Sequence, residues 1–152
     1  MSRPIIRVMR DTGADVALPL PSYATAGAAG ADLRADLGGS AVTLMPGERR
    51  IIPTGLRVQI PDGWEIQIRP RSGLALKSGL SLPNTPGTID SDYRGPLGVL
   101  MINLDGQPQT ITHGERIAQM IVAPAPQARF ELVTELDDSE RGQGGFGSTG
   151  RG

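Results

Sequence analysis

The chain has 152 residues, near the modal length of one domain, and a formal net charge of −1 with no run of like charges. This composition excludes a basic nucleic-acid-binding surface and a charged membrane-surface helix, and the absence of cysteine excludes disulfides, thiolate metal sites and cysteine catalysis. No apolar stretch approaches the roughly 20 residues of a spanning helix, and the N-terminus does not resemble a signal peptide. We therefore expect one soluble, cytoplasmic domain.

Short apolar runs are broken by Gly and Pro at intervals of roughly eight to twelve residues, which predicts an all-β fold closed as a small jelly-roll-like β-barrel. The predicted strands, in chain order, cover residues 5–9, 31–36, 42–44, 50–53, 56–60, 64–68, 99–104, 117–123 and 130–133. The runs 99–104 and 117–123 are dense enough in aliphatic residues to be buried on both faces.

One short helix is predicted over residues 72–79, where Ser72 can cap the start and Gly79 can close the end. From Asp137 onward the apolar pattern stops, and a glycine-rich tail follows that cannot bury a core. We expect a β domain over residues 1–136 and a mobile C-terminal arm over residues 137–152.

The densest chemistry lies between Gly87 and Gly95, which reads Gly-Thr-Ile-Asp-Ser-Asp-Tyr-Arg-Gly. Taken alone, the pair Asp90 and Asp92 fits either an acidic surface hairpin, the commoner case, or a functional site. Tyr93 favours the functional site, because aromatic residues are scarce in this chain and this one has no obvious core to fill.

Two further segments are candidates for binding an anion. Arg71 and Ser72 precede the predicted helix, whose first backbone N–H groups favour phosphate; the alternative is a capping serine beside a solvated arginine. In the tail, glycines flanked by Arg141 and Ser148 can direct several amides at one phosphate, or the tail is a disordered terminus. Phe146 favours the first alternative, because an exposed phenylalanine lowers solubility unless it covers a flat surface.

Two polar residues interrupt otherwise apolar strands and need partners there. Asp32 lies in the run Ala29–Ala35, and Gln119 lies in the run Gly114–Ile121. Each is compatible with a satisfied core group as well as with a binding site.

Taken together, five segments resemble, in order and spacing, the five motifs of the trimeric dUTPases: 29–35, 70–75, 87–95, 114–121 and 141–150. The resemblance spans nearly the whole chain, and the third and fifth motifs are almost intact. It implies hydrolysis of dUTP to dUMP and pyrophosphate with Mg²⁺ bound by the triphosphate, a reaction that supplies dUMP for thymidylate synthesis and keeps uracil out of DNA.

The resemblance also implies roles for single residues. Asp90 matches the general base that prepares the attacking water, and Tyr93 matches the residue that packs on the deoxyribose and excludes a 2′-hydroxyl. The uracil-reading edge corresponds to Asn84, Gly87, Thr88 and Ile89. The phosphate ligands correspond to Arg71, Ser72, Gly73 and Gln119, and the closing arm contributes Arg141, Phe146, Gly147 and Ser148.

Asp32 resembles a motif-one aspartate that reaches Mg²⁺ through water only, in keeping with the reluctance of Mg²⁺ to lose its hydration shell. The family forms homotrimers with sites shared between subunits, and the same is implied here, with no nucleic acid or membrane as partner. Pro96 and Ser78 depart from the family's usual residues, and we interpret His113 as a surface turn residue.

Two alternatives stay open at this point. A dCTP deaminase of the same fold would use a catalytic glutamate and lack the arm, and a non-catalytic module would keep the nucleotide pocket without turnover. Asp90 and the tail Phe-Gly-Ser-Thr favour hydrolysis over both.

Overall fold

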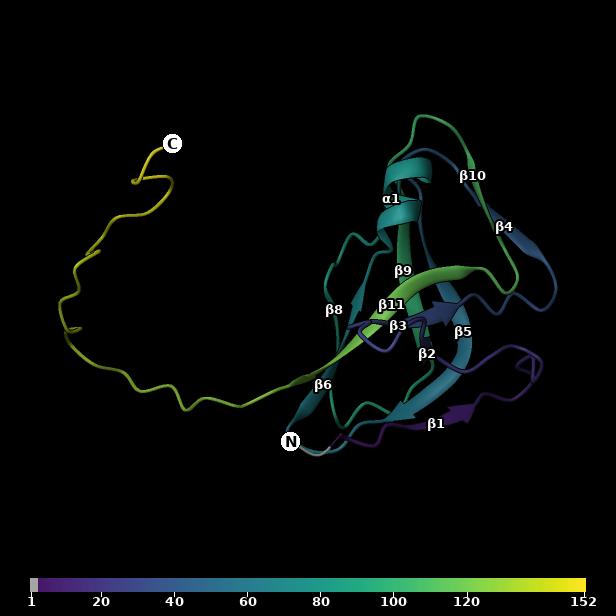
Figure 1. Cartoon of the computed structure of the whole chain (residues 1–152), viewed down its shortest axis with the longest axis horizontal. Helices are drawn as coiled ribbons and strands as arrows, with labels where there is room; N and C mark the ends of the chain where they lie inside the picture. The colour runs from purple at the N-terminus through teal and green to yellow at the C-terminus, as the bar shows by residue number, and fades with distance from the viewer. Residues whose placement is uncertain (1–2) are drawn as a thin grey trace.

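The computed structural model describes residues 3–152, which fold into short strands and a two-turn helix (Figure 1). In chain order the elements are β1 (Arg7–Arg10), β2 (Ser22–Tyr23), β3 (Ala31–Arg34), β4 (Ala41–Leu44), β5 (Arg49–Gln59), β6 (Trp64–Arg69), α1 (Ser72–Ser78), β7 (Leu80–Ser81), β8 (Gly87–Ile89), β9 (Leu97–Asn103), β10 (Gln109–Thr112) and β11 (Arg116–Pro124). The all-β prediction with one short helix is confirmed.

Within residues 3–152 the strands form three sheets, with orders β1-β5-β9-β7, β2-β3-β11-β6-β8 and β10-β4. Neighbouring strands in all three sheets are antiparallel. Over these described residues the three sheets do not join into the expected closed barrel. The strands at three of the four edges of the larger sheets, β2, β7 and β8, span only two or three residues, too few to continue a ladder around a barrel.

One continuous apolar cluster fills the interior and draws on both larger sheets. Because side chains alternate between the faces of a strand, β9 buries Leu97, Val99 and Met101, and β6 buries Ile66 and Ile68. The intervening residues of β9 are half-buried, so the expectation that this strand is buried on both faces is met on one face only.

The structure corrects one strand division and adds four short strands. The predicted strands 50–53 and 56–60 are one strand, β5, with a register shift between Pro53 and Leu56 where it pairs with β9. Short strands β2, β7, β8 and β10 were missed, because two to four residues carry too little periodicity to be recognised.

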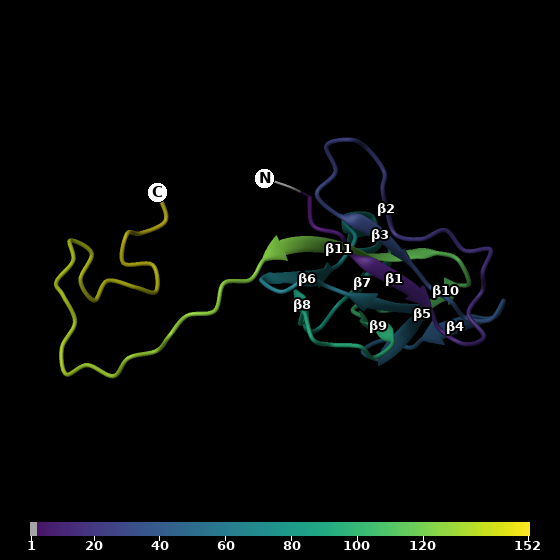
Figure 2. The same cartoon turned by 90° about the horizontal axis from the view of Figure 1, so that it is seen from below.

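Beyond β11 the chain leaves the sheets and extends away from them in both views (Figures 1 and 2). The predicted strand 130–133 is wrong: this segment has no ladder partner, and Phe130 and Leu132 are 95% and 100% exposed. Apolar alternation alone indicates which face a strand would bury, but it cannot supply a neighbouring strand.

Helix α1 covers Ser72–Ser78 and ends at Gly79, whose φ of 62° is the left-handed conformation that glycine adopts without strain. Ser72 is not its cap. The N-cap position is occupied by Arg71, which makes no capping side-chain hydrogen bond because a guanidinium has only donors and cannot accept from a backbone N–H. Its guanidinium is instead paired with Asp32. No helix in the described part of the chain is long and apolar enough to cross a membrane.

Candidate functional site

Strand β11 lies between β3 and β6, and its register aligns three predicted site segments. Gln119 of β11 is opposite Asp32 of β3 on one side and opposite Arg69 of β6 on the other. Since Arg69 leads directly into Arg71 and α1, the pairing places Asp32, Gln119 and the start of the helix at one end of the five-stranded sheet. We call Asp32, Arg71, Arg116 and Gln119 the arginine cluster.

Ion pairs hold the arginine cluster together. Asp32 Oδ1 lies 3.2 Å from Arg71 Nε, and Asp32 Oδ2 lies 3.4 Å from Arg116 Nη1. The Asp32 side chain is 18% exposed, whereas that of Arg116 is 45% exposed. One carboxylate therefore orients two guanidinium groups and leaves the cluster with a net positive charge, which suits an anion such as phosphate.

Arg116 was missed from the sequence. Strand alternation from Gln119 would place Arg116 on the other face of β11, but a register shift between Arg116 and Ala118 turns it towards Asp32. A bulge of this kind has no marker in the apolar pattern. The one available signal was its position within the fourth motif-like segment.

Gln119 is fixed from two directions. Its Nε2 donates a hydrogen bond to the Pro70 carbonyl at 3.0 Å, and its side chain lies against Gly30. A Cβ at Gly30 would stand 2.3 Å from Gln119 Oε1, so a larger residue there would displace the amide. Ser72 and Gly73 are exposed in the adjoining first turn of α1.

A separate cavity of about 700 Å³ contains the other predicted site residues. Asn84, Thr88, Ile89, Asp90 and Tyr93 line it, and apolar groups of β5 and β9 form the facing wall. Gly87 is buried behind Asn84, whose amide nitrogen stands 3.3 Å from the position of a Cβ on that glycine. The cavity has the size of a typical small-molecule site. We call it the nucleoside pocket, after the part of the substrate that the family resemblance assigns to its residues.

The arginine cluster and the nucleoside pocket share no lining residue. None of Asp32, Arg71, Ser72 or Gln119 is among the residues that line the nucleoside pocket in the described chain. One copy of the chain therefore presents two candidate sites of different chemistry, one apolar with a carboxylate and the other cationic. We call them half-sites, because the family resemblance implies that one substrate uses both.

The third group of predicted residues lies on the arm, which extends away from the sheets (Figure 1). Arg141 Nε donates to the carbonyl of Gly144 at 2.7 Å, within the arm itself. Phe146 is fully exposed and has a φ of 50°, a strained value for a bulky residue, and it is followed by Gly147 and Ser148 in successive turns. The structure brings none of them to the body of their own chain.

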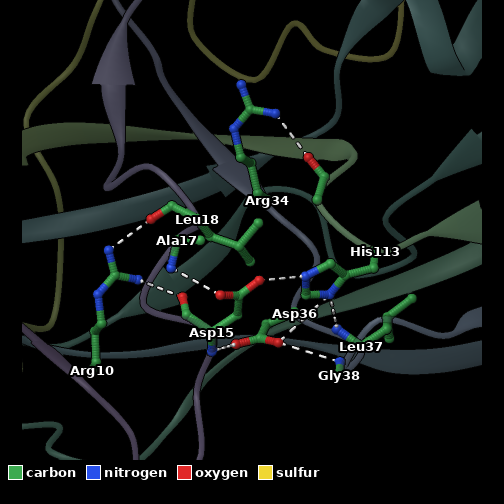
Figure 3. Close-up of polar contacts among 10 residues, drawn as sticks. Arg10, Asp15, Ala17, Leu18, Arg34, Asp36, Leu37, Gly38 and His113 are labelled. Atoms are coloured by element: carbon green, nitrogen blue, oxygen red, sulfur yellow. Dashed lines mark hydrogen bonds and ion pairs between the residues drawn. The ribbon is translucent and has the colours of Figure 1, made fainter.

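His113 links three loops beside the nucleoside pocket (Figure 3). Its Nδ1 accepts from the Leu37 N–H at 3.0 Å, so in the neutral ring Nε2 carries the proton that is donated to Asp15 at 2.8 Å. Asp36 lies 3.7 Å from Nδ1 and accepts the Asp15 N–H at 2.8 Å. The His113 side chain is 19% exposed, which corrects its interpretation as a surface residue.

The loop that His113 holds continues from residues 11–14, which line the nucleoside pocket and were not predicted to do so. Arg10 fixes the same loop through the carbonyls of Asp15 at 3.1 Å and Leu18 at 2.6 Å. Asp11, at its start, is ion-paired with Arg57 at 2.8 Å. One wall of the pocket thus depends on polar contacts between segments far apart in sequence.

The donor groups do not form a resident metal site. No group of three or more His, Cys, Asp or Glu side chains in residues 3–152 is arranged to hold a metal ion, and Asp32 already faces two arginines. A hard cation such as Mg²⁺ needs several oxygen ligands, so most of them would have to come from a bound phosphate chain and water.

Comparison with known proteins identifies the family. The model of the dUTPase family matches residues 17–150. The chain belongs to the dUTPase family. It is 62% identical over 152 residues to a protein of Dinoroseobacter shibae named deoxyuridine 5′-triphosphate nucleotidohydrolase, covering 97% of this chain and 98% of that protein. A protein of the same name from Roseobacter denitrificans is also 62% identical, over 91% of each chain.

Solved structures of dUTPases share the fold. A mutant of the Staphylococcus bacteriophage 80alpha dUTPase with dUpNHpp superposes with a TM-score of 0.84 at 26% identity, covering 97% of this chain and 99% of that one. A dUTPase from phage phi11 of S. aureus has a TM-score of 0.76 at 22% identity, over 89% and 99% of the two chains. The arrangement of sheets described above is therefore the dUTPase fold.

The Asp15–His113 contact predicts how this dUTPase responds to acid. The hydrogen bond from His113, followed by that from the Ala17 N–H, lowers the pKa of Asp15 in the folded chain. Ionised Asp15 therefore stabilises the fold above its unfolded pKa of about 3.9, and this contribution is lost as the pH falls through the lower, folded value.

Asp15→Asn, which keeps an acceptor for His113, should be less stable than wild type near neutral pH, and the gap should narrow below about pH 4. Urea unfolding at one fixed chain concentration, repeated across this pH range, measures the gap. A gap that stays constant with pH would show that the Asp15 carboxylate is not stabilised by these contacts.

Proposed function

We propose that this chain hydrolyses dUTP to dUMP and pyrophosphate and thereby supplies dUMP for thymidylate synthesis and keeps uracil out of DNA. The observation that carries the proposal is its 62% identity, over nearly the full length of both chains, to relatives named deoxyuridine 5′-triphosphate nucleotidohydrolase. The two half-sites support it, because a nucleoside triphosphate needs an enclosed pocket for its base and sugar and cations for its phosphates.

In the proposed mechanism the nucleoside pocket receives deoxyuridine. Asn84 and the β8 backbone from Gly87 to Ile89 read the uracil edge, and the ring of Tyr93 lies against the deoxyribose. Asp90, exposed in the same pocket, accepts a proton from the water whose oxygen attacks the α-phosphorus. The new bond joins that oxygen to phosphorus, and the bond from the α-phosphorus to the bridging oxygen breaks as pyrophosphate leaves with the electron pair.

The arginine cluster receives the phosphates. Arg71, held by Asp32, and the exposed Ser72 and Gly73 donate to phosphate oxygens, and Gln119 borders the same space. Arg116 adds a second cation that the resemblance did not assign. A triphosphate bound here would carry Mg²⁺, which would neutralise part of its charge, and the contact of Asp32 with this ion through water stays a prediction.

We infer that the complete site is shared between copies in a homotrimer. The support is the separation of the nucleoside pocket from the arginine cluster within one chain. The arm supports the same inference, because its apolar and cationic residues are exposed and have no contact surface on their own body. In this arrangement Arg141 and Ser148 bind the terminal phosphate, and Phe146 and Gly147 close over the uracil of a neighbouring site.

Pyrophosphate release from the four deoxynucleoside triphosphates and UTP, measured with Mg²⁺, tests the function directly. Release from dUTP far above the others is expected. Ammonia from dCTP without pyrophosphate from dUTP would indicate the deaminase of the same fold, and nucleotide binding without turnover would indicate a binding module. The cytoplasmic location stays a prediction.

Asp90→Asn should preserve dUTP binding and lower kcat by about 10² or more, the scale of a lost general base. The exchange keeps the shape of the side chain, so binding measured with a non-hydrolysable analogue serves as the control. Turnover near the wild-type rate would remove Asp90 from the mechanism.

Mixing two inactive variants tests whether sites are shared. Asp90→Asn removes the base of the nucleoside pocket, and Arg71→Ala removes a phosphate ligand of the arginine cluster. If each site draws one half from each of two chains, random assembly in equal amounts leaves about a quarter of the sites intact. Refolding the variants together should therefore recover about a quarter of the wild-type activity.

The matched control mixes Arg71→Ala with Gln119→Ala, two changes in the same half-site. Every site in that mixture contains a damaged arginine cluster, so no recovery is expected. Equal activity in both mixtures, or none in either, would contradict shared sites.

A chain that ends after Leu136 should fold and assemble like wild type, because the arm makes its hydrogen bonds within itself. It should turn over dUTP slowly, because the arm can no longer close over the site. Circular dichroism and light scattering check the fold and assembly. Phe146→Ala, which keeps the arm without its ring, should give an intermediate rate. Full activity of the truncated chain would refute the role of the arm.

A further inference from the structure

The ring of Tyr93 is seated by the two residues that follow Arg94. Its hydroxyl donates a hydrogen bond to the carbonyl oxygen of Pro96 at 2.9 Å. The ring lies against Gly95 so closely that a Cβ built there would stand 2.4 Å from Oη, 2.6 Å from Cζ and 2.9 Å from Cε2. All three distances are shorter than real contacts of a Cβ atom, so the ring occupies the space of the missing side chain.

The backbone on both sides of this contact is tied to the body. Arg57 Nη1 donates to the Arg94 carbonyl at 3.1 Å, and Thr54 Oγ1 donates to the buried Leu97 carbonyl at 2.6 Å. Arg94 Nη1 in turn donates to the Ser91 carbonyl at 2.7 Å. The turn is therefore fixed before and after Gly95, and a conflict with a new side chain would be relieved by movement of the ring.

The ring is free to make that movement. Tyr93 is 41% exposed and lines the nucleoside pocket, so it can swing outward without opening the core. Such a movement would change the shape of the pocket and leave the free energy of unfolding nearly unchanged. This separates a positioning role of Gly95 from a structural one.

We propose that Gly95, together with the Pro96 carbonyl, determines sugar specificity by positioning the Tyr93 ring. Gly95 sets how deeply the ring can lie, and the hydrogen bond to Pro96 sets its orientation. This inference rests on the proposed function, in which Tyr93 packs on the deoxyribose and leaves no room for a 2′-hydroxyl. With the ring displaced, the pocket loses contact with deoxyribose and gains room for ribose.

Gly95→Ala tests the proposal through kcat/KM for dUTP and for UTP. A misplacement of about 1 Å can cost on the order of 10²-fold in rate, so the ratio of the two values should fall at least about tenfold. Gly106→Ala is the matched control, because a Cβ at Gly106 meets nothing within 4 Å. The control should keep the wild-type ratio, and an unchanged ratio in Gly95→Ala would overturn the proposal.

A double variant shows whether Gly95 acts through the ring. The closest overlap is with the Tyr93 hydroxyl, so Tyr93→Phe removes it together with the bond to Pro96. Tyr93→Phe alone should lower the dUTP-to-UTP ratio up to about tenfold, the scale of one hydrogen bond. Adding Gly95→Ala to that background should lower the ratio less than it does in wild type, because only the overlaps with Cζ and Cε2 remain. In a Tyr93→Ala background, which removes the ring, Gly95→Ala should leave the ratio unchanged, and a further fall there would refute coupling through the ring.

The activities of wild type on dUTP and on UTP distinguish failure of the proposed function from failure of the positioning role. If wild type releases no pyrophosphate from dUTP, the proposed function fails; if wild type rejects UTP and Gly95→Ala rejects it equally well, the positioning role alone fails. Thermal unfolding of each variant completes the test. A Gly95→Ala chain that does not fold would also contradict the proposal, because it would show that the ring cannot yield.

Discussion

The constraint on which the rest of the structure depends is the register of β11 between β3 and β6. Because Gln119 is opposite both Asp32 and Arg69, three segments separated by dozens of residues in sequence meet at one end of a sheet. A slip of one residue would turn every side chain of β11 to the opposite face. It would bury Gln119 and expose its apolar neighbours, so the apolar core and the arginine cluster enforce the same alignment.

Glycine has a specific use in both half-sites. Gly30 lies against Gln119, Gly87 against Asn84 and Gly95 against Tyr93, and in each case the side chain of the predicted site residue approaches where a Cβ would stand. Contacts this close fix a side chain by shape without adding polar groups that would compete for the ligand. The predicted site residues are thus positioned by glycines without a side chain as well as by hydrogen bonds.

Several features of the fold could be predicted from the sequence, because they depend on local signals. The all-β class follows from short apolar runs, and the end of α1 follows from Gly79, because these signals are local. Arg116 was missed because the bulge that turns it depends on the pairing of β11 with β3. The predictions of a closed barrel and of a strand over residues 130–133 were wrong, because sheet closure and strand pairing depend on residues distant in sequence. The resemblance named the residues of both half-sites and implied that sites are shared between subunits, but it did not reveal that His113 holds a wall of the pocket.

The central position of β11 also bears on the order in which the chain acquires structure. β11 is the last strand in sequence, yet it separates β3 from β6 in the five-stranded sheet. On a ribosome, β3 and β6 must therefore wait, unpaired with each other, until residues 116–124 have left the exit tunnel. Completion of the sheet and alignment of Asp32 with Gln119 are then one event, so a nascent chain cannot assemble the arginine cluster before its core is closed.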